Sequence, residues 1–145
     1  KINVSKFGPR IAGCGGFVNI TQNTQNVVFC GTFTTGKLKE EIKDGKLTII
    51  QEGSVRKFVP SVDHITFSGD YARKQGQHVY YITERAVFEM KEDGIHLTEI
   101  APGIDLQKDV LDQMGFTPIM KDVKVMPEFI FKDELMGLKE MKANR

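Results

Sequence analysis

The fold of this chain is decided by the stretch Ala86-Val87-Phe88-Glu89-Met90-Lys91-Glu92-Asp93-Gly94-Ile95-His96-Leu97-Thr98-Glu99-Ile100. Apolar and β-branched residues on both sides of Asp93-Gly94 predict two strands, and this dipeptide supplies the positive φ values that a tight strand reversal demands. The same device occurs upstream, where Lys43-Asp44-Gly45-Lys46 separates two strand-like runs at residues 38–42 and 47–50. We therefore expect two antiparallel hairpins.

Further strands and two helices are expected around these hairpins. Val27-Val28-Phe29-Cys30 is typical of a short buried strand, and residues 62–67 and 79–83 are also strand candidates. From Asp105 onward the apolar residues recur at helical spacing, with Asp105 as the N-cap and Gly115 as the stop. A second helix is expected to begin around Pro127.

The composition bounds the class of protein. The chain has 145 residues, 40% of them apolar and 27% charged, as a globular domain with a real core does. Its formal net charge of +1 gives no general attraction for phosphate backbones, so we expect no nucleic acid partner. No apolar run approaches the roughly 18 residues of a membrane-spanning helix, so we expect no membrane partner. Two cysteines make no disulfide framework, which favours a cytoplasmic location.

The run Gly13-Cys14-Gly15-Gly16-Phe17 is the motif most open to a functional interpretation. Three glycines in four positions allow positive φ and a close approach of backbone N–H groups to a ligand, as in anion-binding nests and oxyanion holes. Glycine-rich runs also occur where a strand reverses tightly or two backbones pack closely. Taken alone, the motif leaves both interpretations open.

Other chemistry-bearing residues give weaker patterns. His64, His78 and His96 lie 14 and 18 residues apart, without the close spacing of a zinc site, so we expect no metal. Cys14 beside glycines invites a nucleophilic role, but the sequence marks no base for it. Glu84 lies between two apolar runs, and an ion pair with Arg85 or a neighbouring strand is favoured over catalysis.

Four segments, in this order, resemble the acyl-CoA:carboxylate CoA-transferases, the family that includes acetate, propionate and 3-oxoacid CoA-transferases. They are Ile2-Asn3-Val4-Ser5-Lys6-Phe7-Gly8, Gly13-Cys14-Gly15-Gly16-Phe17-Val18-Asn19-Ile20, Ile82-Thr83-Glu84-Arg85-Ala86-Val87-Phe88 and Gly94-Ile95-His96-Leu97-Thr98-Glu99-Ile100-Ala101-Pro102-Gly103-Ile104. Their order and rough spacing are those of the second, β-subunit-like half of the family, and the last is similar to its G-L-x-L-x-E-x-x-x-G stretch. The resemblance extends to about Met120 and is strongest to fused short-chain acyl-CoA transferases.

This resemblance implies a fold and a domain. The expected fold is α/β, part of an open, mostly parallel sheet flanked by helices, with added antiparallel hairpins. Residues 1–145 are expected to be the C-terminal part of a β-subunit-like domain, a fragment of a longer protein that does not begin with an initiator Met. The implied partners are the remaining N-terminal part of the same enzyme and further copies in a homo-oligomer.

The resemblance also implies a reaction. In this family a glutamate attacks the acyl-CoA thioester and is converted through an acyl–glutamyl anhydride into a glutamyl-CoA thioester, from which CoA passes to a short carboxylate such as acetate. By this comparison the Gly16 N–H is the expected catalytic oxyanion donor, and Gly13, Gly15 and Gly16 are the expected CoA contacts. Coenzyme A is expected as substrate, with no permanently bound cofactor.

One family element has no counterpart here. The family nucleophile lies in an S-E-N-G type segment before the glycine run, and nothing in the sequence resembles it. We therefore expect this chain alone to be inactive. The alternatives are a catalytically inactive binding or assembly module, and a relative of the same α/β type that binds a sugar phosphate at the glycine run.

Overall fold

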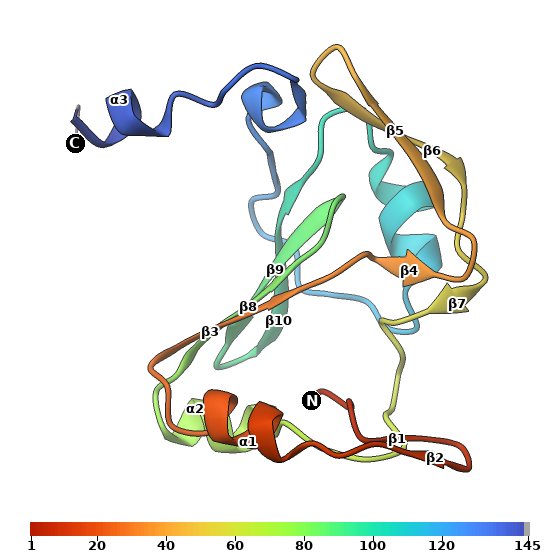
Figure 1. Cartoon of the computed structure of the whole chain (residues 1–145), viewed down its shortest axis with the longest axis vertical. Helices are drawn as coiled ribbons and strands as arrows, with labels where there is room; N and C mark the ends of the chain where they lie inside the picture. The colour runs from red at the N-terminus through yellow and green to blue at the C-terminus, as the bar shows by residue number, and fades with distance from the viewer. Residues whose placement is uncertain (144–145) are drawn as a thin grey trace.

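A five-stranded sheet organises the structure, a computed structural model that describes residues 1–143 (Figure 1). In spatial order its strands are β11 (Lys124–Val125), β10 (Gly94–Ile100), β9 (Ala86–Lys91), β8 (His78–Ile82) and β3 (Asn26–Cys30). The hairpin expected around Asp93-Gly94 is confirmed: it joins β9 to β10, and Gly94 adopts a positive φ of 142°. The second hairpin is confirmed as β5 (Lys39–Lys43) and β6 (Lys46–Gln51). At its turn Asp44 and Gly45 have φ of 53° and 76°.

The α/β class, with an open sheet, helices and antiparallel hairpins, is confirmed, but the sheet is mixed rather than mostly parallel. β3 pairs with β8, and β11 with β10, in parallel, whereas β9 pairs antiparallel with both β8 and β10. The reason is the short connections within β8–β9–β10, because a tight turn can join only antiparallel neighbours. Two further pairs of short strands complete the β-structure: β1 (Lys6–Phe7) with β2 (Arg10–Ile11), and β4 (Thr34–Thr35) with β7 (Val55–Arg56).

The prediction of a strand at residues 62–67 is wrong. Only a single bridge forms there, between Phe67 and Ile2. The N–H groups of Thr66 and Phe67 both donate to the carbonyl oxygen of Ile2, at 2.8 and 3.0 Å. One residue of the N-terminal segment therefore accepts both of these backbone hydrogen bonds. Within residues 1–143 no strand pairs with this stretch over several residues.

The helices are short. They are α1 (Gly15–Thr21), α2 (Gly69–Lys74) and α3 (Leu138–Ala143), with the tighter or wider turns η1 (Leu106–Val110), η2 (Leu111–Gln113) and η3 (Glu128–Phe131). The N-cap role of Asp105 is confirmed, because its carboxylate accepts the Lys108 N–H at 2.8 Å. The helical segment that it starts ends at Gln113, with Met114 as the C-cap, so the expected stop Gly115 is the first residue after the cap. The helix expected from Pro127 is not formed: the four-residue turn η3 follows Pro127, and α3 begins only at Leu138.

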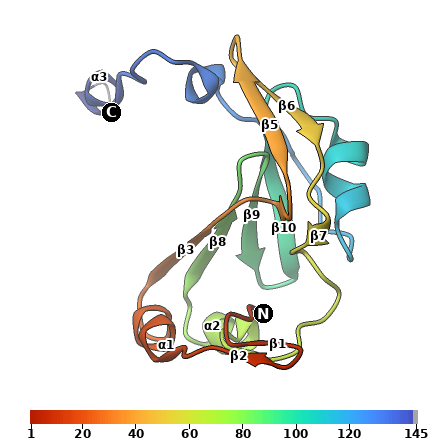
Figure 2. The same cartoon turned by 45° about the vertical axis from the view of Figure 1, so that its right-hand side comes forward.

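The core lies against one face of the sheet. Towards one end of the strands, the buried residues Val27, Val79 and Met90 pack with Phe67 and with Ala72 of α2, and Phe17 of α1 closes this cluster. Figures 1 and 2 show both helices at that end. The larger cluster, towards the other end, brings the sheet together with η1, η2 and the β5–β6 hairpin; among its members are Phe33, Leu47, Phe88, Leu97, Val110 and Met114. Both ends of the inner face are therefore covered.

Candidate functional site

The glycine run forms the start of α1. Cys14 is its N-cap, with φ −127° and ψ 9°, and its carbonyl oxygen accepts the Val18 N–H at 3.0 Å. Gly13, Gly15 and Gly16 are absent from the positive-φ residues of the described chain, so the left-handed turn that the motif allows is not formed. The chain enters a right-handed helix directly, for which negative φ values suffice.

The space around the run is open. Gly13, Gly15 and Gly16 are exposed, and a Cβ placed on any of them would meet no heavy atom within 4 Å, apart from near chain neighbours and the helix backbone itself. Close packing of two backbones, the structural explanation for such glycines, is therefore not found within residues 1–143. The first N–H groups of a helix have no acceptor in the helix, and the Cys14 side chain makes no capping hydrogen bond. The run can therefore offer backbone donors to a molecule that comes close.

A buried serine anchors the run. Ser5 is 4% exposed, and its hydroxyl lies 2.6 Å from Nδ1 of His64 and 2.8 Å from the hydroxyl of Thr66. Its carbonyl oxygen accepts the N–H of Ala12, the residue before Gly13, at 2.8 Å. The residues around His64, which do not form the expected strand, thus hold the N-terminal segment that carries the glycines. Sequence reasoning missed Ser5 and Thr66, because only the fold brings them together.

The cysteines and histidines are spread over the molecule. Cys14 is half-buried, whereas Cys30 is exposed at the end of β3, so its expected burial is wrong: alternation along the strand turns it away from the core. His96 is buried, with Nε2 2.6 Å from the Asp93 carboxylate, and this hydrogen bond holds the pKa of Asp93 below its usual value. Among residues 1–143, no three His, Cys, Asp or Glu side chains gather as a metal site would require.

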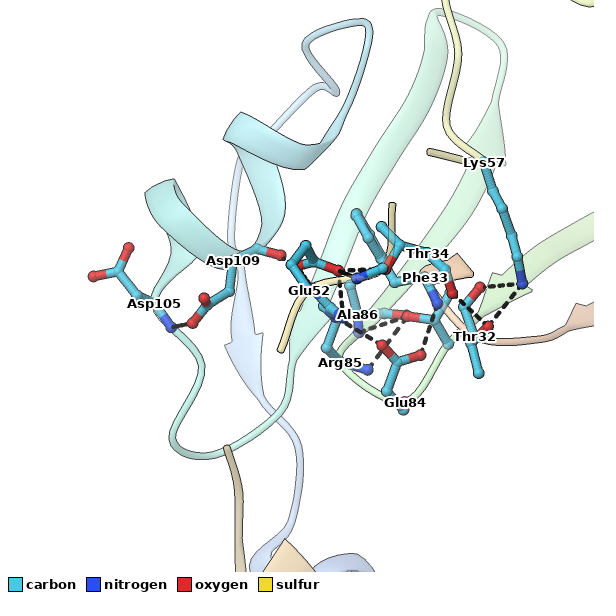
Figure 3. A network of polar contacts seen from close by, with 12 residues as sticks. Thr32, Phe33, Thr34, Glu52, Lys57, Glu84, Arg85, Ala86, Asp105 and Asp109 are labelled. Atoms are coloured by element: carbon cyan, nitrogen blue, oxygen red, sulfur yellow. Dashed lines mark hydrogen bonds and ion pairs between the residues drawn. The ribbon is translucent and has the colours of Figure 1, made fainter. Parts of the chain in front are cut away.

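Glu84 belongs to a buried ion-pair network rather than to a cleft (Figure 3). The Arg85 side chain is fully buried, and its Nε donates to Glu84 at 2.7 Å while its Nη1 donates to Glu52 at 2.6 Å. The second oxygen of Glu84 accepts the Phe33 N–H at 2.8 Å. The favoured interpretation of Glu84, a structural ion pair with Arg85, is confirmed.

The network joins four parts of the chain. Besides the two carboxylates, Arg85 contacts the carbonyl oxygen of Asp109 in η1 at 3.1 Å, and its guanidinium lies 5.1 Å from the centre of the Phe33 ring. Glu52 also accepts hydrogen bonds from the Thr34 hydroxyl and the Gly53 N–H. Burial alone would raise the pKa of Glu52, but the hydrogen bonds from Arg85 and Thr34 outweigh it and the pKa lies below its usual value. The charges of this network therefore hold the elements together.

A depression of the surface lies away from the glycine run. A depression of about 360 Å³ is lined by residues of the β5–β6 turn and of the segment after η3, and none of the glycine-run residues lines it. Among the described residues, no helix has the length and apolar character needed to cross a membrane.

Comparison with known proteins gives close relatives. The chain is 55% identical to the acetate CoA-transferase YdiF of Escherichia coli K12, over 94% of this chain and 26% of that protein. It is 52% identical to the caffeate CoA-transferase of Acetobacterium woodii, over 94% of this chain and 27% of that protein. No family model matches the chain.

The fold matches as well. The acyl-CoA transferase YdiF of Escherichia coli O157:H7, crystallised as a thioester complex with CoA, superposes with a TM-score of 0.91 over 94% of this chain and 27% of that one. Its apoenzyme gives a TM-score of 0.90. The chain thus spans about a quarter of the length of the relatives that it matches. Over that quarter, sequence and structure both confirm that this chain is similar to the acyl-CoA:carboxylate CoA-transferases, as its motifs indicate.

Proposed function

We propose that this chain acts as a β-subunit-like part of a CoA-transferase, which moves CoA between an acyl-CoA and a short-chain carboxylate such as acetate. The observation that carries this proposal is the similarity to acyl-CoA transferase YdiF, 55% in identity and 0.91 in TM-score, because that protein was crystallised as a thioester complex with CoA. The proposal includes a nucleophilic glutamate outside these 145 residues, so the chain alone is expected to show no transfer.

The proposed chemistry forms an oxyanion at every step. A glutamate carboxylate oxygen attacks the thioester carbonyl carbon and the C–S bond breaks. CoA leaves as a thiolate, and the glutamate is left as an acyl–glutamyl anhydride. The thiolate then attacks the glutamyl carbonyl, which releases the first carboxylate and forms the glutamyl-CoA thioester. The acceptor carboxylate then attacks the glutamyl-CoA thioester, which releases the CoA thiolate and forms a new anhydride. The thiolate attacks the acceptor's carbonyl in this anhydride, which gives the new acyl-CoA and frees the glutamate. Each attack places negative charge on a carbonyl oxygen, and backbone donors aimed at that oxygen lower the barrier.

We assign this donor role to the Gly16 N–H, with Gly13 and Gly15 beside it against the CoA thioester. Three observations support the assignment. The glycines are exposed, and the segment before them is fixed by the buried Ser5. Beyond near chain neighbours and the helix backbone, no heavy atom of residues 1–143 lies within 4 Å of the place where a Cβ on each would stand. A Cβ at Gly16 would take up space that the ligand needs, although the protein itself leaves that space empty.

A transfer assay on the complete gene product tests this function. With acetyl-CoA as donor and a second short carboxylate as acceptor, we expect CoA exchange. Gly16→Val should lower kcat by about 100-fold or more, the usual effect of losing one oxyanion donor. Asn19→Val is the matched control, since it places the same β-branched side chain at an exposed position of the same helix. Full turnover by Gly16→Val would contradict the assignment, and no exchange by the wild-type protein with any short carboxylate would contradict the function.

A further inference from the structure

One face of the five-stranded sheet is bare at its β3 end. We call it the open face and define it by Val28, Cys30, Tyr80 and Ile82, which the parallel register of β3 and β8 places side by side. Val28 is 52% and Ile82 37% exposed, and Cys30 is exposed as well. Their neighbours along the strands, which point to the other face, are more buried: Val27 is 5% and Val79 0% exposed, and Phe29 and Tyr81 are half-buried.

This arrangement is unusual for parallel strands. Parallel pairs occur almost only where both faces of the sheet are covered, because their strands are apolar on both sides. β3 and β8 form such a pair, yet α1 and α2 pack with only one of their faces. Within residues 1–143, Figure 2 shows no helix or strand over the other side of β3. The open face therefore has the apolar composition of a covered surface without the cover.

The edge of the sheet leads to the same conclusion. β3 is an edge strand whose sequence, Asn-Val-Val-Phe-Cys, contains no charge and no proline. Proteins protect exposed edges with short strands, lysines, prolines or bulges. The opposite edge fits that rule, since β11 has two residues and one of them is Lys124. The uncharged five-residue edge at β3 has none of these devices and is suited to accept a further strand.

We propose that the β3 edge and the open face dock against the part of a CoA-transferase polypeptide that has no counterpart in this chain, with a strand of that part pairing with β3. The proposal rests on the proposed function and names the partner surface. The size of the relatives supports this occupant: the chain accounts for 27% of the superposed acyl-CoA transferase, so about three quarters of that chain has no counterpart here. A polypeptide of that size can supply both a strand and apolar side chains for the open face.

The exposed thiol of Cys30 reports directly on this docking. In the 145-residue chain produced alone, we expect iodoacetamide to alkylate Cys30 at close to the rate of an exposed thiol, with Cys14 followed separately by peptide mass spectrometry. In the complete gene product we expect the rate at Cys30 to fall at least about tenfold. Equal rates in the two proteins would overturn the proposal. Protection in the isolated chain, together with sedimentation as a dimer, would also overturn it, because a second copy would then cover the face.

Two variants with the same charge change sharpen the test. Val28→Lys places a cation on the open face, and Ile50→Lys places one at an exposed position of β6, where Ile50 is 61% exposed. Both isolated chains should keep the circular dichroism of the wild type. In the complete protein, Val28→Lys should restore fast labelling of Cys30, and Ile50→Lys should not. Equal effects would contradict a specific role for this face. Labelling of Cys30 needs no CoA transfer. The labelling test can therefore fail while the transfer assay succeeds, and the transfer assay can fail while the labelling test succeeds.

Discussion

At the scale of single residues, two groups of positions differ in their surroundings: those that hold the fold together and those that face open space. Arg85 belongs to the first group, because its guanidinium is fully buried between Glu52 and Glu84. The glycines at the start of α1 belong to the second, because nothing in the described chain packs against them. The two groups should respond differently to substitution.

Replacing Arg85 should be costly. Arg85→Ala leaves two carboxylates without their partner, and breaking a buried ion pair in this way lowers the free energy of unfolding by about 3–5 kcal/mol. Arg73→Ala is the control, because Arg73 pairs with Asp70 at the surface and such pairs are worth under about 1 kcal/mol. Urea unfolding of both variants measures the difference. Similar midpoints for the two would show that the network adds little.

Acid should weaken the same network. The pKa of Glu52 is lower in the folded chain than its ordinary value of 4.5, so the folded state favours the carboxylate. Its contribution is complete above pH 4.5 and is lost as the pH falls below that value towards the lower, folded pKa. Urea midpoints between pH 6 and pH 3 should therefore fall less steeply for Glu52→Gln than for the wild type. Parallel slopes would be at odds with the lowered pKa.

Gly16→Ala should separate stability from activity. Alanine favours a helix over glycine by up to about 1 kcal/mol, and a Cβ at this position meets no atom within 4 Å, so the isolated chain should be slightly more stable. In the complete protein the same methyl group would stand where the thioester is proposed to lie, so CoA transfer should fall. Thermal melts and the transfer assay give the two readouts. A gain in stability with unchanged transfer would place the ligand elsewhere.

At the scale of elements, the glycine run depends on a segment far away in sequence. Ser5→Ala removes the hydroxyl that bonds His64 and Thr66, so the segment before Gly13 should loosen. Hydrogen exchange at the Ala12 amide, which donates to the Ser5 carbonyl oxygen, should become faster. Ser61→Ala, at an exposed serine, is the control and should leave this amide unchanged. Unaltered exchange in Ser5→Ala would mean that the backbone alone fixes the run.

The elements also show how far sequence reasoning reaches. Both hairpins are predictable, because Asp-Gly turns and alternating apolar residues are local signals. The stretch at residues 62–67 has strand-like composition, but it meets only Ile2, and that partner is visible only in the fold. The start of α1 at Gly15 is missed for a similar reason: glycine has low helix propensity, and packing of Phe17 decides the outcome.

At the scale of the whole molecule, the proposed site rests mainly on resemblance. Composition and spacing leave the glycine run open to two interpretations, and within residues 1–143 the structure removes close packing as its explanation. In the proposed function, a donor role for Gly16 depends on where the thioester and the nucleophilic glutamate lie. The open face likewise points to a partner outside this chain, since it is apolar surface that residues 1–143 do not cover.

The most direct test of the central claim is intact-protein and peptide mass spectrometry of the complete gene product after incubation with acetyl-CoA. We predict a covalent adduct equal to CoA minus water, carried by a glutamate outside residues 1–145, which disappears on addition of acetate. The 145-residue chain alone should carry no adduct under the same conditions. An adduct on a residue of this chain, or no adduct in a complete protein that also fails to exchange CoA, would contradict the account.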